Sequence, residues 1–295
     1  MGEVLVIGLV EGTLFGLLAV GITLIHRGTG AISFALGEVG TLGLYVAWWL
    51  SIDQGHPWLV GALGAIGAAV LLSLVFERVV VRPMRVRNPL AISVATVGLL
   101  TALLAFEFQQ LGESPREVPV PIAGIGVRIA GVNVSPTQLL SVVVVAAIAL
   151  GLAQFLRRTD FGLGVLAAAQ DPDATRLVGV PLHRVTAFVW ATGGAVAALA
   201  ALFVAPSVGA LTPGFASTHL FVVALIAAVV GGLSSLPGAF VGGLALGVLK
   251  SGVLRVFADS TLPGKEYLVY FAIAVVVLLV RPNGILASAP VRTTS

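Results

Sequence analysis

The sequence predicts an all-α polytopic membrane protein with about nine membrane-spanning helices, within a range of about eight to ten. Hydrophobic residues make up 58% of the chain and charged residues only 10%, whereas soluble domains carry about 25% charged residues. The hydrophobic residues are also grouped in runs close to the roughly 20 residues that a helix needs to cross a bilayer. Both observations exclude a soluble domain, and we treat residues 1–295 as a single transmembrane domain.

The apolar runs follow one another along the whole chain. They occupy residues 4–25, 33–50, 58–77, 91–108, 136–156, 185–205, 218–233, 238–257 and 266–280. Only a few residues separate the first two runs, and Gly and Pro interrupt the chain at residues 231–238. Such interruptions are tolerated in a membrane where the backbone lines a cavity or is enclosed by protein. We therefore expect some of these helices to be broken or re-entrant.

Glycines recur at intervals of four in the first and eighth runs. The stripes are Gly8, Gly12 and Gly16; Gly238 and Gly242; and Gly243 and Gly247. Small residues at this spacing let helix backbones approach each other closely. We interpret the stripes as packing seams.

The basic residues predict the orientation in the membrane. If the loop after the first run is cytoplasmic, eleven of the 16 Lys and Arg residues lie on the cytoplasmic side. Only Arg116, Arg128 and Lys265 lie outside, while Lys250 and Arg255 fall within a span. Because cytoplasmic loops carry an excess of Lys and Arg, we expect an external N-terminus and a cytoplasmic C-terminus.

Two charged residues within the runs are candidates for the translocation path. A charge in the bilayer is costly unless it is paired or faces water. Glu38, beside Gly37, either borders the path or braces a packed turn near the cytoplasmic interface. Lys250, about 18 Å beyond Gly238 at 1.5 Å per residue, either faces a cavity or subunit interface or extends its side chain to the membrane surface. Glu11, in the first run, is a weaker example of a charged residue within a span that could either border the path or serve packing.

The charged break at residues 157–184 has the signals of two short helices outside the bilayer, at about 162–170 and 172–178. Asp171 can cap the second helix, Pro172 suits its first turn, and Gly179 ends it. Apolar side chains in a segment too polar to span predict a surface that a cytoplasmic partner covers. The candidate contact residues are Gly162, Leu163, Leu166, Asp171, Leu177, Val178 and Gly179.

The longest external segment, residues 109–135, is rich in Pro and Gly. It predicts short strands or turns around residues 118–121 and 127–129. The segment is large enough for a landing surface for an extracytoplasmic partner, and a plain connecting loop is equally compatible.

Other classes of function find no support in the sequence. The chain has no Cys, and its four His residues are scattered without metal-ligand spacing, so we expect no metal site. No catalytic Ser/His/Asp order and no nucleotide-binding loop is present, since residues 264–266 lack the Gly-rich spacing of a phosphate loop. A basic patch with interleaved aromatics, as in nucleic-acid-binding proteins, is also absent. We expect neither an enzyme nor a nucleic-acid-binding protein.

Four segments together resemble the permease subunits of branched-chain (hydrophobic) amino acid ABC importers of the LivH type. They are ISFALGE at residues 32–38, the segment 161–180, GGLSSLPG at 231–238 and RPNG at 281–284. The resemblance implies a subunit that works in a bacterial or archaeal cytoplasmic (inner) membrane, in a homo- or heterodimer of permeases. This subunit would import branched-chain or other small amino acids, or amides. The resemblance also implies a second permease subunit, an extracytoplasmic solute-binding protein, and separate ATPase subunits that hydrolyse ATP and dock on segment 161–180.

Three residues depart from that family's pattern. Leu36, Leu166 and Lys250 stand where the family commonly has His, Arg and an acidic residue. The change at 166 points to a different ATPase partner. The changes at 36 and 250 leave the substrate open among branched-chain amino acids, other small amino acids and short amides.

An ion-coupled secondary transporter or channel for a small solute is the alternative function. It needs paired acids within the membrane for proton or sodium coupling. Glu11 and Glu38 are sparse and near the interfaces, so the sequence favours the ATP-driven importer.

Overall fold

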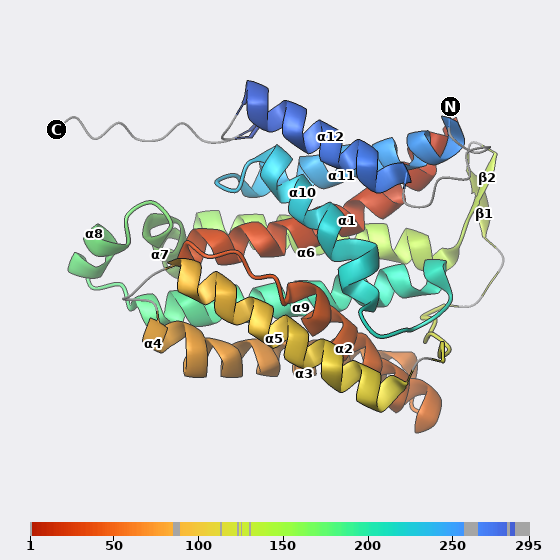
Figure 1. Cartoon of the computed structure of the whole chain (residues 1–295), viewed down its shortest axis with the longest axis horizontal. Helices are drawn as coiled ribbons and strands as arrows, with labels where there is room; N and C mark the ends of the chain where they lie inside the picture. Colours follow the sequence, from red (N-terminus) through yellow and green to blue (C-terminus); the bar gives the residue numbers. More distant parts are fainter. Residues whose placement is uncertain are drawn as a thin grey trace.

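The computed structural model describes residues 2–84, 89–112, 114–122, 124, 126–129, 131–256, 265–281 and 284–286. They form an elongated bundle of helices (Figure 1). Six helices are long and apolar enough to cross a membrane. They are α1 Gly2–Thr29, the continuous helix Trp58–Met84, α5 Pro89–Leu111, α6 Pro136–Arg158, α9 Leu182–Val208 and α11 Leu236–Val256. The predicted all-α polytopic class is confirmed.

The remaining helices are shorter. The continuous helix Trp58–Met84 consists of α3 Trp58–Phe76, the π-helical turn η2 Glu77–Val81 and α4 Arg82–Met84. A second π-helical turn, η1 Trp49–Asp53, extends α2 Leu36–Trp48, and a third, η3 Ser217–Phe221, precedes α10 Val222–Gly231. The chain continues to α12 Lys265–Val280, and α7 Asp160–Ala168 and α8 Pro172–Leu177 lie between α6 and α9. Each of the nine predicted apolar runs falls on a helix of the described part of the chain.

The turn at residues 231–238 joins two helices of unequal length. The continuous helical segment before it, Ser217–Gly231, is shorter than a full span. The helix after it, α11, has 21 residues, close to the roughly 20 that cross a bilayer. The turn therefore connects one helix that is too short to cross the bilayer alone with one of spanning length.

Helices α1 and α9 form the centre of the bundle. In their apolar stretches 61% and 67% of residues are buried, more than in the other four long helices. Helix α9 packs against α1, α2 and α3, while α11 packs along the other side of α1. The inner helices thus contact protein along much of their length, and outer helices such as α5 present apolar side chains outward.

The glycine stripes explain how closely α1 and α11 pack. A Cβ atom at Gly12 would lie 2.8 Å from the Cα of Leu244, and one at Gly8 would lie 2.5 Å from the Cα of Val248. On the opposite helix, a Cβ at Gly243 would meet the backbone of Gly16. The two backbones are in contact, which only glycine permits.

Local signals in the chain define where α6 begins and where α9 ends. The Gln138 N–H donates to the Ser135 hydroxyl at 3.2 Å, and the Ser135 N–H donates to the Gln138 side chain at 2.9 Å. This reciprocal capping box starts α6. Helix α9 ends at Gly209, whose φ of 80° is left-handed, as is common for glycine after a helix.

The segment before α6 contains a small hairpin. Strands β1 Val127–Ile129 and β2 Val132–Val134 pair antiparallel, as the sequence predicts. Residues 117–120 form no strand, and Arg116 instead makes an isolated bridge with Leu211. Pro119 and Pro121 lack the backbone N–H that a ladder needs.

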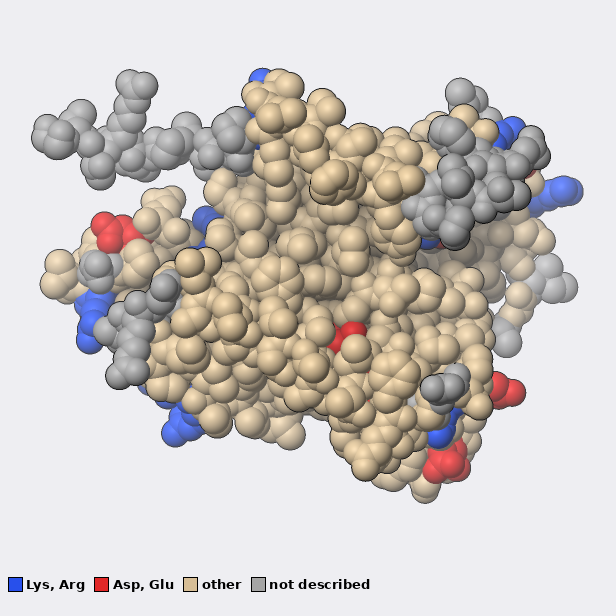
Figure 2. All heavy atoms as spheres, in the orientation of Figure 1, with Lys and Arg blue, Asp and Glu red and all other residues tan. Residues whose placement is uncertain are grey.

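Charged groups gather at the two ends of the bundle. Figure 2 shows Lys, Arg, Asp and Glu mainly at these ends, with a broad band between them that is largely uncharged and in which some acidic atoms are visible. One end carries α7 and α8, and the other carries the hairpin and the N-terminus (Figure 1). A protein that crosses a bilayer along its long axis is expected to have this distribution.

Candidate functional site

Helices α7 and α8 form a bracket that projects from one end of the bundle (Figure 1). Helix α7 begins at Asp160, two residues before its predicted start, because the Thr159 hydroxyl accepts from the Gly162 N–H at 3.0 Å. Asp171 caps α8 as predicted, accepting from the Ala174 N–H at 2.9 Å. Gly179, with φ of 85°, follows the end of α8. The structure therefore contains the two short helices that the sequence predicts.

Three of the four apolar candidates on this bracket remain exposed. Leu163 is 50% exposed, Leu177 is 89% exposed and Val178 is 78% exposed. Leu166 instead is partly buried and packs against the hydrophobic core. We refer to Leu163, Leu177 and Val178 as the bracket surface. Its apolar side chains have no cover within the described chain, as the contact site of a partner would.

An aromatic cluster attaches the bracket to the bundle. The rings of Phe155 on α6, Phe161 on α7 and Phe188 on α9 have centroids 5.3–6.3 Å apart. Gly162 is buried beside them, since a Cβ there would lie 2.6 Å from the Cα of Leu156. This packing makes α7 a rigid extension of two long helices, so a displacement of the bracket would be transmitted to α6 and α9.

Glu38 lies inside the bundle against a second acid, Glu107 of α5. Both side chains are 1% exposed, and the two carboxyls interact electrostatically. One Glu107 oxygen accepts from the Gly214 N–H at 2.9 Å. Glu107 was not among the predicted site residues, although it is the one charged residue in the run 91–108. A charge within a membrane span is the signal that also identified Glu38, and it applies equally to Glu107.

Gly37 brings this acid pair close to the η3 segment. A Cβ at Gly37 would lie 2.9 Å from the Cα of Ser217. Beside it, the Thr41 hydroxyl accepts from the Ala216 N–H at 2.9 Å. Helices α2 and α5 and the turn at 212–216 therefore meet around two carboxyls. This is the geometry that a brace requires, and a place for Glu38 on the translocation path stays a prediction.

Replacing Glu107 should separate its hydrogen-bonding role from its charge. Glu107→Leu leaves the buried Gly214 N–H without an acceptor and should lower the free energy of unfolding by about 1–3 kcal/mol. Glu107→Gln keeps an acceptor and relieves repulsion between the two acids, so we expect a change below about 1 kcal/mol. Thermal unfolding of the purified variants in detergent measures both. Equal destabilisation by Leu and Gln would contradict the brace.

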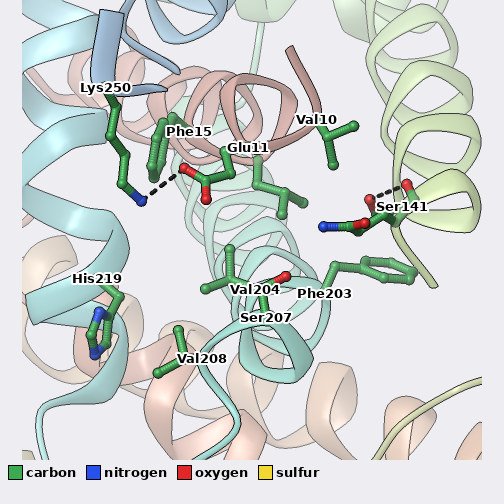
Figure 3. A pocket seen from close by; sticks show the side chains of 12 residues that line it. Val10, Glu11, Phe15, Ser141, Phe203, Val204, Ser207, Val208, His219 and Lys250 are labelled. Atoms are coloured by element: carbon green, nitrogen blue, oxygen red, sulfur yellow. Dashed lines mark hydrogen bonds and ion pairs between the residues drawn. The ribbon is translucent and has the colours of Figure 1, made fainter. Parts of the chain in front are cut away.

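Lys250 forms an ion pair with Glu11. The Lys250 Nζ lies 2.7 Å from a Glu11 oxygen, and each side chain is 27% exposed. Figure 3 shows the two side chains pointing toward each other beside a cavity of about 140 Å³. The structure thus places Lys250 at the wall of a cavity, and a part for it in the translocation path stays a prediction. Glu38 is not among the residues that line this cavity, so Lys250 and Glu38 lie at different places in the bundle.

No group of three or more His, Asp or Glu residues that could hold a metal ion occurs among the described residues. Ion pairs among those residues join Arg82 to Glu77, Lys250 to Glu11 and Arg255 to Glu3.

The chain is similar to known transport proteins over almost its whole length. A family model described as "Branched-chain amino acid transport system / permease component" matches residues 4–280. The high-affinity branched-chain amino acid transport system permease protein BraD of Pseudomonas aeruginosa is 32% identical, over 96% of this chain and 94% of that protein. The corresponding LivH protein of Escherichia coli is also 32% identical, over 95% and 93%.

More distant similarity is found in an archaeon and among solved structures. The probable branched-chain amino acid transport permease protein LivH of Methanocaldococcus jannaschii is 28% identical, over 97% of this chain and 93% of that protein. A chain of PsaBC from Streptococcus pneumoniae in complex with Fab aligns with a TM-score of 0.52, covering 95% of this chain and 93% of that one. At 15% sequence identity, this structural match indicates a shared fold alone.

Proposed function

Because the chain belongs to the family of branched-chain amino acid transport permeases, we propose that it is the permease subunit that carries branched-chain or other small amino acids into the cell. The observation that carries this proposal is the family match from residue 4 to residue 280 together with 32% identity over 96% of the chain. The protein is a membrane-spanning ABC transport component and not an enzyme. Its energy comes from ATP that a separate subunit hydrolyses.

The bracket surface is the proposed docking site of that ATPase. Leu163, Leu177 and Val178 are exposed at an end of the bundle outside the long apolar helices. The caps at Thr159 and Asp171 hold the two short helices in place, and Phe155, Phe161 and Phe188 connect α7 to α6 and α9. A conformational change in the ATPase would thus reach the membrane helices through packed side chains.

Further partners follow from the same membership. We propose a second permease subunit within the bilayer and an extracytoplasmic solute-binding protein. The segment 109–135, which includes the β1–β2 hairpin, lies at the end opposite the bracket and is the proposed landing surface for the binding protein. The membrane is the bacterial or archaeal cytoplasmic membrane, with the bracket on the cytoplasmic side.

Alkaline phosphatase fusions test this orientation, because the enzyme is active only outside the cytoplasm. A fusion after Val120 should be active and a fusion after Pro172 inactive. The reason is the excess of basic residues on the bracket side, where Arg157, Arg158, Arg176 and Arg184 lie. The reverse pattern would contradict the proposed orientation, because it would mean that the bracket lies outside the cytoplasm.

Reconstituted transport tests the function itself. Proteoliposomes containing this chain, its partner permease and its ATPase should take up L-leucine with the binding protein when ATP is supplied on the ATPase side. Uptake that needs an ion gradient and no ATPase would instead support the secondary transporter. Glu11 lies opposite a lysine, whereas Glu38 and Glu107 form a buried pair of acids. The family match, and not the arrangement of acids, therefore favours the ATP-driven importer over ion coupling.

A further inference from the structure

The close packing of α1 and α11 brings Glu11 and Lys250 face to face. Gly8, Gly12 and Gly16 on α1 lie against the α11 backbone around Gly243 and Gly247. Glu11 and Lys250 extend from the same pair of helices and meet at 2.7 Å. The seam is held by backbone contact along several turns, so the helices do not depend on this ion pair to stay together.

The pair faces a cavity that has both polar and apolar walls. The cavity of about 140 Å³ lies between α1, α6, α9, α11 and the η3 segment. Gln138, Ser207 and His219 supply polar groups, and Phe15, Phe203 and Val204 supply apolar surface. Glu11 and Lys250 are the charged residues that line it, so the wall as a whole carries no formal net charge while His219 is neutral.

We propose that this cavity binds a small neutral α-amino acid as its zwitterion. The Lys250 ammonium receives the α-carboxylate, the Glu11 carboxylate receives the α-ammonium, and the apolar wall receives the side chain. The inference rests on the proposed function and assigns the residues that recognise its substrate. When the amino acid binds, the ion pair between Glu11 and Lys250 is replaced by two ion pairs, one from each residue to the ligand. No charge is therefore left unpaired in a low-dielectric place.

The charge balance also determines what the cavity rejects. An amine without a carboxylate leaves Lys250 without a partner, and a carboxylate without an amine leaves Glu11 without one. Each of these two side chains is only partly buried, at 27% exposed. We expect an unpaired charge at this place to weaken binding by at least a factor of about thirty. The apolar wall of Phe15, Phe203 and Val204 favours an amino acid with an apolar side chain.

A second ion pair between the same helices provides a matched control. Arg255 and Glu3 also join α11 to α1, at 3.3 Å, but they are 56% and 51% exposed and do not line the cavity. The double variant Glu3→Gln/Arg255→Met therefore removes an interhelix ion pair without touching the proposed site. The test variant is Glu11→Gln/Lys250→Met, which removes both charges at once and leaves neither partner stranded.

Binding of radiolabelled L-leucine to the full-length chain in lipid nanodiscs tests the inference, without the binding protein. The parent and the Glu3→Gln/Arg255→Met control should bind leucine alike, and Glu11→Gln/Lys250→Met should bind it at least about thirtyfold more weakly. Against the parent, 3-methylbutylamine and 4-methylpentanoate, which are leucine without its carboxylate or its amine, should compete at least about thirtyfold more weakly than leucine.

The single variants should reverse this preference, which a purely structural ion pair would not do. Lys250→Met retains the carboxylate of Glu11 and should prefer 3-methylbutylamine to leucine. Glu11→Gln retains the ammonium of Lys250 and should prefer 4-methylpentanoate. The neutral double variant supplies the test even if a single variant does not fold.

Several outcomes overturn the inference. Unchanged leucine binding by Glu11→Gln/Lys250→Met is one, and equal competition by leucine and either analogue is another. Competition by isobutyramide equal to that by leucine is a third, because an amide needs neither charge. If the parent complex takes up leucine with ATP and the neutral double variant does so equally, the inference fails and the proposed function stands. If the parent complex takes up no amino acid, both fail.

Discussion

Leu177→Asp is expected to weaken association with the partner ATPase by at least about a hundredfold. Leu177 is 89% exposed on the bracket, and burying such a side chain in an interface contributes roughly 1.5–3 kcal/mol. Aspartate loses this contribution and adds an unpaired charge at the contact. At about 1.4 kcal/mol per factor of ten, the combined effect reaches a hundredfold. Co-purification with the ATPase and ATP-dependent uptake are the measurements.

Two further variants show whether a loss of ATPase binding by Leu177→Asp is specific to the bracket surface. Asp171→Ala removes the cap on α8, which costs about 1 kcal/mol, so it should weaken association only by about fivefold. Val127→Asp changes another exposed apolar residue, 56% exposed and on β1 at the opposite end, and should leave ATPase binding unchanged. All three proteins should still insert in the membrane. If Leu177→Asp retains the ATPase as well as the parent does, the bracket surface is not the docking site.

Gly243→Leu is expected to prevent stable folding of the bundle. A Cβ at this position meets the backbone of Gly16, and backbone cannot move aside as the end of a side chain can. The cost should exceed the roughly 1–3 kcal/mol of ordinary overpacking, because α1 and α11 must separate along the seam. We expect loss of the monodisperse protein peak in detergent and a large fall in thermal stability.

Gly98→Leu is the matched control. Gly98 also lies in an apolar long helix, α5, but no atom lies within 4 Å of a Cβ built there. The variant should fold as the parent does, because leucine is well accommodated in such a helix. Equal stability of Gly243→Leu and Gly98→Leu would show that the α1–α11 seam does not determine the stability of the bundle. Cavity binding would then also lose its geometric basis, since the seam positions Glu11 and Lys250.

The sequence alone predicted the features that depend on neighbouring residues in the chain. The lengths of the apolar runs predicted the spanning helices, because a bilayer has a fixed thickness. Asp171, Pro172 and Gly179 predicted α8, because caps and helix stops act within one turn. Helix α7 begins two residues before its predicted start, because Thr159 caps it. The orientation rests on the distribution of basic residues and stays a prediction.

The tertiary structure decided which of these features meet. Glu38 and Glu107 belong to different runs, and so do Glu11 and Lys250; the stripes of glycine predicted close packing without naming the partner helix. The sequence also did not predict that Leu166 is partly buried while the other three apolar candidates, those of the bracket surface, are exposed. Hydrophobicity is non-directional, so a run of apolar residues determines that a helix enters the membrane. Which faces pack together is decided by the fit of the whole bundle, and with it which charges become partners.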